Sequence, residues 1–389
     1  MAKYKLDELC EFITDGTHQT PEYCAEGGII FLSSKDVTER KINWDDVKYI
    51  PNSLHEKLCK RLSPKKNDIL LAKNGTTGVA AIVDKDEVFD VYVSLAVLRP
   101  LDTIYPKYLL YAINSPVAKR QFNAGLKGIG VPNLHLGVIR ETVVNVAPRK
   151  DQEKICEILD KVATLIDERK TELELLDKLV KARFVELFGN IETGNFEYET
   201  RKLGDVASIG SSHRVFTTEF VDNGIPFYRG TEIGELASGQ KPSEPYYISE
   251  EHYRRLTNDD TKPEVGDLLM PSICNKGQVW MVDTEEPFYY KDGRVLCISP
   301  DRMVFNSKFL QYFMKEKTLV EYPKMGSGST FAEFKIFLLK DIDVLIPPKK
   351  IQDQFADFVR QVDKSKIAVQ KALDETQLLF DSLMQKYFG

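Results

Sequence analysis

The chain has 389 residues, of which 42% are hydrophobic and 29% are charged, with a formal net charge of −6. This composition is ordinary for a globular protein and excludes a disordered or collagen-like chain, while the length predicts two or three domains. No apolar run approaches the ~18 residues of a membrane-spanning helix, and the N-terminus lacks the apolar core of a secretory signal. Six scattered cysteines without a Cys-x-x-Cys pair argue against a disulfide scaffold and a zinc site. We therefore expect a cytoplasmic protein.

Residues 1–149 contain short apolar runs bounded by Gly, Pro and Asn, a pattern typical of strands. The predicted strands are Ile29–Leu32, Ile69–Leu71, Val79–Val83, Val91–Leu98 and Val143–Val146. A short helix is predicted at Pro106–Phe122. The basic run from Lys57 to Lys66 is either a solvated face or a phosphate contact.

Residues 150–188 predict one long helix, because they contain neither Gly nor Pro and lie between Pro148 and Gly189. Such a helix is roughly 58 Å long at 1.5 Å per residue. Its 3-4 spaced apolar positions persist over about five heptads, which indicates a coiled coil. The alternative is an amphipathic helix that packs only on its own domain.

Residues 190–389 repeat this plan with an offset of about 200 residues. After a predicted linker at Gly189–Thr200 come predicted strands at Leu268–Met270, Val279–Val282, Val295–Ile298 and Ile342–Ile346, with a helix at Ser307–Tyr322. A second long helix is predicted for residues 350–388. The chain is therefore one unit used twice, each unit having a globular part and a long helix.

The predicted seam positions of the two long helices are equivalent between the repeats. In the first helix they are Ile155, Leu159, Val162, Ile166, Leu173, Leu176, Val180 and Leu187. In the second they are Phe355, Val359, Val362, Val369, Leu373, Phe380, Leu383 and Tyr387.

Several catalytic patterns are missing from the sequence. It has no phosphate-binding Gly-x-x-x-x-Gly-Lys-Ser/Thr loop, no Asn/Asp-Pro-Pro-aromatic tetrapeptide and no histidines at metal-ligand spacing. Asp301 followed by Glu333 and Lys335 mimics the carboxylate–lysine set of metal-dependent nucleases, but the first repeat has Asn133-Leu134-His135 at the corresponding place. We expect no cofactor, no metal and no catalytic residue.

The duplicated plan resembles the specificity subunit of type I restriction–modification enzymes over the whole chain. The resemblance depends on the order of several motifs, each of which is weak alone. They are Thr14–Pro21, Ala72–Gly78, Gly210–Phe216, Gly224–Gly230 and the segments before the long helices, Ala147–Glu153 and Pro347–Asp353. The second pre-helix segment departs from the first, since Ile351 and Asp353 replace Asp151 and Glu153.

This resemblance implies an α+β fold with two mixed α/β target recognition domains, each followed by a long helix. Residues 1–149 and 190–348 would be the recognition domains, and residues 150–189 and 349–389 would form an antiparallel coiled coil with a pseudo-twofold relation. The family reads a bipartite sequence on double-stranded DNA, binds two methyltransferase subunits and, through them, the restriction–motor subunits. It has no active site and no membrane association.

Candidate base-reading residues are polar, loop-borne side chains, since Arg reads guanine, Asn and Gln read adenine, and Ser, Thr and Lys assist. In residues 1–149 they are His18, Gln19, Ser33, Lys35, Lys73, Asn74, Thr76, Thr77, Lys127, Asn133 and His135. In residues 190–348 they are His213, Arg214, Arg229, Thr231, Asn275, Lys276, Ser327, Ser329, Thr330 and Lys335. Asp15 and Gly16 are expected to shape a turn instead.

Two other functions remain open from the sequence. A coiled-coil adaptor that binds only protein agrees with the low positive charge, because phosphate contacts need Lys and Arg. A nuclease using Asp301, Glu333 and Lys335 is less favoured, because the pattern is loose and unrepeated.

Overall fold

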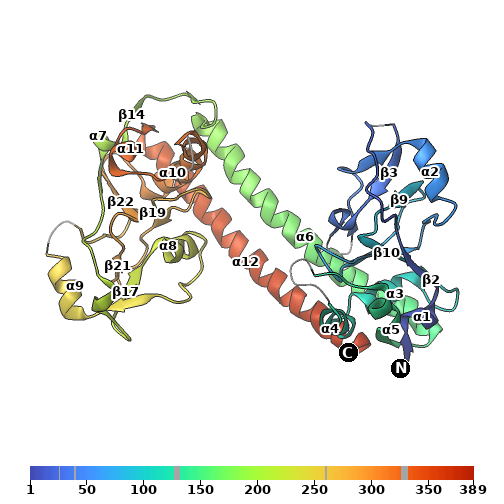
Figure 1. The fold of residues 1–389 in the computed structure, drawn as a ribbon. Coiled ribbons are helices and arrows are strands. Elements are labelled where there is room, and N and C mark those ends of the chain that lie inside the picture. Colours follow the sequence, from blue (N-terminus) through green and yellow to red (C-terminus); the bar gives the residue numbers. More distant parts are fainter. Residues whose placement is uncertain (26, 39–40, 127–131, 259–260, 326–331) are drawn as a thin grey trace. The chain divides into compact units, whose positions relative to one another are not determined.

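The computed structural model describes residues 1–25, 27–38, 41–126, 132–258, 261–325 and 332–389. These residues form two compact units, Met1–Thr171 with Val369–Gly389, and Glu172–Ala368, so that each long helix contributes to both (Figure 1). Among the described residues, no helix is long and apolar enough to cross a membrane.

The first globular part is built on two small sheets. The four-stranded sheet has the order β2 (Cys10–Asp15), β10 (Leu95–Pro100), β7 (Ile69–Ala72) and β8 (Ala80–Ile82), all antiparallel. In the other, β3 (Ile29–Leu32) lies between antiparallel β6 (Lys48–Ile50) and parallel β9 (Phe89–Val91). Two further pairs are β1 (Ala2–Lys5) with β11 (Val143–Val146), and β4 (Val37–Thr38) with β5 (Lys41–Ile42). The helices are α1 (Leu6–Leu9), the 3₁₀ turn η1 (Ser34–Asp36), α2 (Asn52–Leu58), α3 (Pro106–Ile113), α4 (Pro116–Ala124) and α5 (Leu136–Glu141).

The second globular part repeats this topology. Its first sheet has the order β15 (Ala207–Gly210), β22 (Val295–Pro300), β19 (Leu268–Pro271) and β20 (Trp280–Met281). The other has the order β16 (Phe220–Val221), β18 (Tyr246–Ile248), β17 (Ile225–Tyr228) and β21 (Tyr289–Tyr290), and β17 and β21 are again parallel. Strand β14 (Thr200–Lys202) pairs with β23 (Asp343–Leu345), as β1 pairs with β11. The helices are α7 (Leu203–Val206), η2 (Thr217–Glu219), α8 (Gly230–Ala237), α9 (Glu250–Leu256), α10 (Ser307–Glu321), η3 (Tyr322–Met325) and α11 (Ile336–Lys340).

Three predicted elements differ from the structure, each because of a local turn. The predicted strand Val91–Leu98 is wrong as one element, because a turn with a 2.9 Å hydrogen bond from Leu95 N to Tyr92 O separates β9 from β10. The predicted helix Pro106–Phe122 is two helices, since Pro116 has no N–H to donate and Ser115 caps the start of α4. The predicted linker at 189–200 contains a small hairpin, β12 (Gly189–Asn190) with β13 (Asn195–Phe196).

The two long helices are α6 (Arg149–Phe188) and α12 (Lys349–Phe388). In the first unit, Ile155 and Leu159 near the start of α6 share a core with Phe380 and Phe388 near the end of α12. In the second unit the ends are exchanged, and the last part of α6 shares a core with the first part of α12. The helices therefore run antiparallel.

The predicted seam positions vary in burial. Ten of them are buried: Ile155, Leu159, Val162, Ile166, Val180, Phe355, Val359, Val362, Val369 and Phe380. The others, Leu173, Leu176, Leu187, Leu373, Leu383 and Tyr387, are half-buried.

Each long helix also packs on a globular part with its last turn. Phe188 at the end of α6 contacts Phe309 of α10, with ring centroids 4.9 Å apart. Phe388 at the end of α12 contacts Tyr108 of α3 at the same separation. These rings lie outside the predicted seam, so the buried stripe is wider than that of a simple coiled coil.

A buried glutamine joins each globular part to the helix that follows it. Gln152 accepts from Tyr105 N at 2.8 Å and donates to Ala147 O at 2.9 Å. Gln352 accepts from Asn306 N at 2.9 Å and donates to Pro347 O and Val304 O. Because these backbone groups are removed from water, the two glutamines satisfy bonds that would otherwise be lost.

Replacing either glutamine by leucine is expected to lower the free energy of unfolding. The reason is that Gln352→Leu leaves one buried N–H and two carbonyls without this partner, which costs about 2–4 kcal/mol. Gln152→Leu removes fewer bonds and should cost less. Chemical denaturation measures both, with Gln370→Leu as the control, because Gln370 is exposed on α12 and bonds only Asp374 among the described residues. If all three substitutions lowered the free energy of unfolding equally, the stabilising role given to the buried glutamine bonds would be contradicted.

Candidate nucleic-acid interface

The carboxyl ends of several strands lie together at one edge of the first globular part. Strands β2 and β7 both pair antiparallel with β10, so they run in the same direction. Strand β9 reaches this edge through a 3.1 Å hydrogen bond from Thr17 N to Val91 O. Gly16 permits this approach, because a Cβ there would overlap the Val91 carbonyl. The expected turn at Asp15 and Gly16 therefore lies where β2 meets β9.

The loop after β7 is tied to two other segments that carry predicted residues. Asn74 accepts a hydrogen bond from Ser34 Oγ at 3.1 Å, and Thr76 donates to Val37 O at 3.2 Å. Leu134 N donates to Lys73 O at 2.8 Å. The structure thus brings Asn74, Thr76 and Thr77 together with η1 and with the segment before α5.

Lys73 lies inside this edge and not on its surface. Its ammonium is 2.5 Å from Asp15 Oδ2, and both side chains are buried. The His18 ring nitrogen Nε2 is also within hydrogen-bond distance of the Asp15 carboxylate. Arg61 donates to the backbone carbonyls of Asp15 and Gly16. Burial raises the pKa of the Asp15 carboxyl, but the bonds from Lys73 and His18 more than offset this and hold the pKa below its usual range. Lys73 therefore supports the loop, which corrects its assignment as a base-reading side chain.

The second globular part builds the same edge with the same backbone bonds. Ser272 N donates to Arg294 O at 2.8 Å, and Phe334 N donates to Ser272 O at 2.7 Å. The corresponding bonds of the first part run from Lys73 N to Ser94 O and from Leu134 N to Lys73 O. The two repeats therefore make equivalent backbone bonds at this edge while carrying different side chains.

Arg229, like Lys73, is engaged by a buried carboxylate. Its guanidinium pairs with Glu232 in the first turn of α8 and lies 4.4 Å from the Tyr246 ring centroid. The hydrogen bond to Glu232 raises the pKa of Arg229. Burial would raise the pKa of Glu232, but the bonds from Arg229 hold it below its usual value. The Arg229 side chain is 34% exposed, so only about a third of its surface is available to a ligand.

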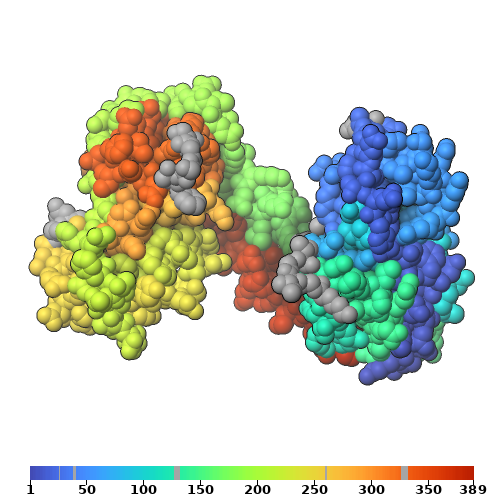
Figure 2. Space-filling model, viewed as in Figure 1, coloured from blue at the N-terminus to red at the C-terminus, as the bar shows by residue number. Residues whose placement is uncertain are grey.

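The other predicted residues occupy the outer part of the two edges. His18, Gln19, Lys35, Thr76, His135, His213, Arg214, Thr231, Asn275, Lys276 and Lys335 are exposed, and Ser33, Asn74, Thr77 and Asn133 are half-buried. Lys127, Ser327, Ser329 and Thr330 lie outside the described residues. Figure 2 shows the surfaces of the globular parts, blue to green for residues 1–148 and yellow-green to orange for residues 190–348.

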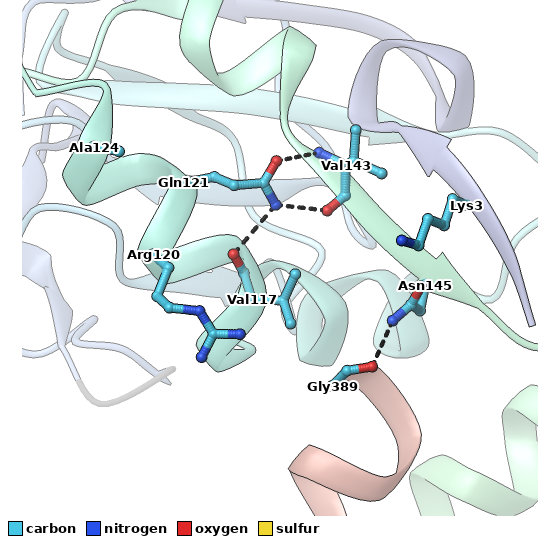
Figure 3. A pocket seen from close by; sticks show the side chains of 8 residues that line it. All are labelled: Lys3, Val117, Arg120, Gln121, Ala124, Val143, Asn145 and Gly389. Atoms are coloured by element: carbon cyan, nitrogen blue, oxygen red, sulfur yellow. Dashed lines mark hydrogen bonds between the residues drawn. The ribbon is translucent and has the colours of Figure 1, made fainter.

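Two cavities differ in their relation to these edges. One of about 430 Å³ is lined by Thr231 and Gly234 of α8 and by Lys276 after β19, so it adjoins the second edge. Another of about 490 Å³ in the first unit is lined by Lys3, Arg120 and Asn145 (Figure 3). There Asn145 donates to the Gly389 carbonyl at 2.8 Å, so this cavity adjoins the joint between β11 and α12 and none of the candidate residues.

The nuclease set is not assembled in the structure. Asp301 follows the end of β22, and its carboxylate accepts from Met303 N at 2.8 Å. Glu333 pairs with Arg294, which precedes the start of the same strand. The six residues of β22 span about 20 Å, so the two carboxylates lie at opposite ends. Within the described ranges, no three His, Cys, Asp or Glu side chains are grouped to hold a metal ion.

Sequence reasoning missed two arginines at these edges. Arg61 belongs to the basic run Lys57–Lys66 but bonds the turn after β2. Arg294 lies just after the turn residues Asp292 and Gly293, and this Asp-Gly pair before an apolar run is a signal for a loop-borne residue at a strand start.

Comparisons with known proteins match both halves of the chain. A family profile described as the type I restriction modification DNA specificity domain matches residues 1–176 and 195–376. The type I restriction enzyme MjaIX specificity subunit of Methanocaldococcus jannaschii is 21% identical, over 94% of this chain and 84% of the relative. The MjaVIII specificity subunit of the same organism is 23% identical, over 78% of this chain and 74% of the relative.

Two solved structures share the fold. The type I restriction–modification S subunit from M. genitalium aligns with a TM-score of 0.59 and 16% identity, covering 100% of this chain and 96% of that one. A chain from a structure of complex assembly and conformational transition in a type I R-M system aligns with a TM-score of 0.58 and 16% identity, covering 99% and 97%. The resemblance seen in the sequence is thereby confirmed.

Lys73→Met is expected to lower the free energy of unfolding by about 3 kcal/mol at pH 7, because it leaves the Asp15 carboxylate buried without its main partner. The folded-state pKa of Asp15 is lowered, so the pair stabilises the protein above the ordinary aspartate pKa of about 3.9. This contribution is lost as the pH falls through the lower folded pKa.

Chemical denaturation of both proteins between pH 7 and pH 3 checks this. The difference between wild type and Lys73→Met should shrink in acid, and adding Asp15→Asn should recover part of the loss. Lys35→Met is the control, because the Lys35 side chain is 51% exposed and its ammonium makes a longer contact, 3.7 Å, with Asp36 Oδ1. A loss that is independent of pH would show that the pair is not its source.

Proposed function

Because this chain belongs to the type I restriction–modification DNA specificity family, we propose that it is the subunit that selects the DNA target of such a complex. The observation that supports this most is the repetition of one polar, loop-borne edge in both halves, each within a family match. Two readers that differ in side chains recognise two different half-sites. The proposed target is therefore bipartite and asymmetric.

The proposed division of labour follows the repeat. Residues 1–149 and 190–348 act as target recognition domains, and the helices at 150–189 and 349–389 link and space them. The side chains proposed to contact DNA are the exposed and half-buried ones at the two edges. Gln19 and Asn74 suit adenine, and Arg214 suits guanine or a phosphate.

The proposed partners are two methyltransferase subunits and, through them, the restriction–motor subunits. Large apolar side chains on the outer sides of the long helices support a protein partner there. Leu175 and Leu179 of α6 are 56% and 48% exposed, and Leu378 and Leu379 of α12 are 72% and 51% exposed. Exposed apolar groups of this kind are typical of protein contacts. The equivalence of the two helices suits one methyltransferase subunit per repeat. The proposed location of the complex is the cytoplasm, where it would meet its DNA target.

The chain itself is proposed to be non-catalytic. Its role in DNA modification is to hold the catalytic subunits at the target, so chemistry requires the complex. Single-turnover assays with magnesium, ATP and S-adenosylmethionine test this, and product from the purified chain alone that is abolished by Glu333→Gln or Lys335→Ala would contradict the proposal.

Exchanging residues 200–345 for the matching segment of a relative should change one half of the recognised sequence and leave the other. The physical reason is that each globular part carries its own edge, and base discrimination depends on a few side chains worth roughly 1–3 kcal/mol each. Methylome sequencing of cells that carry the chimera and its methyltransferase subunits reads both halves. The reciprocal exchange of the first globular part is the control, and simultaneous change of both halves in either chimera would contradict two independent readers.

A further inference from the structure

Arg294 and Glu333 form an exposed ion pair at the edge of the second globular part. Their side chains are 55% and 30% exposed, and the bond joins Arg294 Nη1 to Glu333 Oε1. Among the described residues, Arg294 Nη2 and Nε and Glu333 Oε2 take part in no further bond. The pair thus presents two arginine N–H donor groups and one carboxylate acceptor next to each other, all available to a ligand.

The backbone under this pair is held by hydrogen bonds on both sides. Ser272, which is buried, donates from its N to Arg294 O and accepts at its O from Phe334 N, so one residue positions both members. The turn before Arg294 is held by Gly293 N, which donates to Ser211 Oγ at 2.8 Å, and Phe334 is buried beside Glu333. Backbone groups positioned in this way need less ordering when a ligand binds, which lowers the entropic cost of binding.

The first repeat carries different residues at the same places. The equivalent backbone bonds place Ser94 where the second repeat has Arg294, and Asn133 where it has Glu333. Ser94 is buried, and its Oγ accepts from Ser34 N at 3.0 Å. The ion pair is therefore not required to build the edge, and it distinguishes the second half from the first.

A carboxylate on a DNA-facing edge costs affinity, because it repels phosphates, unless it accepts a hydrogen bond from a base. In the major groove, cytosine N4 donates and guanine O6 and N7 accept, and carboxylates and arginines are the side chains that match them. A neighbouring arginine and glutamate present the complementary pattern to a single G·C pair. Relying on the proposed function, we propose that Arg294 and Glu333 together read one G·C base pair in the half-site of residues 190–348.

The test uses the full chain with its methyltransferase subunits, a randomised duplex DNA library and sequencing of the bound fraction. Arg294→Ala should reduce the preference for G·C roughly 10- to 100-fold at one position of that half-site. Glu333→Gln should relax the same position. All other positions, and the melting temperature of the complex, should stay unchanged.

The matched control is Arg302→Ala. Arg302 pairs with Asp267 at 2.7 Å beyond the opposite end of β22, so its loss lowers stability and leaves the selected sequence unchanged. An unaltered motif in the Arg294 and Glu333 variants would overturn the inference. The inference would also fail if the two variants relaxed base preference at two different positions. It would fail as well if they lost affinity equally for all sequences and showed a shallower salt dependence, because that pattern indicates a phosphate contact. If the wild-type complex selects no sequence at all, it is the proposed function that fails.

Discussion

The structure depends on burying both ends of each long helix. The start of α6 packs in the first unit and its end in the second, while α12 does the reverse. Neither compact unit is made of one repeat alone, because each takes its core from both helices. The aromatic residues Phe188 and Phe388 end the two helices against α10 and α3, and Gln352 and Gln152 join their beginnings to the globular parts. Changes at Phe188 or Phe388 therefore act on both repeats together, whereas changes at either glutamine act within one repeat.

This arrangement leaves the edges at the strand ends free to diverge. The backbone bonds of Ser272 and Lys73 are equivalent, but Ser272 supports an exposed ion pair while Lys73 itself is paired internally with Asp15. A scaffold whose stability lies largely in the sheets, the glutamines and the helix ends tolerates exchanges of the exposed edge side chains, because these contribute little to the core. For a protein that selects DNA, this separation lets the target change without refolding.

Cationic side chains at the two edges divide into internal supports and exposed groups. Lys73 and Arg229 are bound to Asp15 and Glu232, which are themselves buried. Arg214 is instead 70% exposed and lies 3.5 Å from Asp292. Burying a charge requires a partner, so an internal pair keeps a loop in one conformation, whereas an exposed charge remains available to a polyanion. Residue type alone does not separate the two roles.

The sequence by itself determined the duplication, the two long helices and most of the strands, because these are recorded in local periodicity and in Gly and Pro positions. Helix α6 begins and β3 and β11 begin and end within one residue of the prediction. The family could also be recognised from the sequence, because its motifs occur in the expected order along the chain. Only the tertiary structure decided where the apolar run at 91–98 turns, that Phe188 and Phe388 pack on α10 and α3, and that Arg294 meets Glu333. These depend on contacts between residues distant in the chain, such as the carboxylate of Asp15 and the ammonium of Lys73 58 positions later, which no local pattern records.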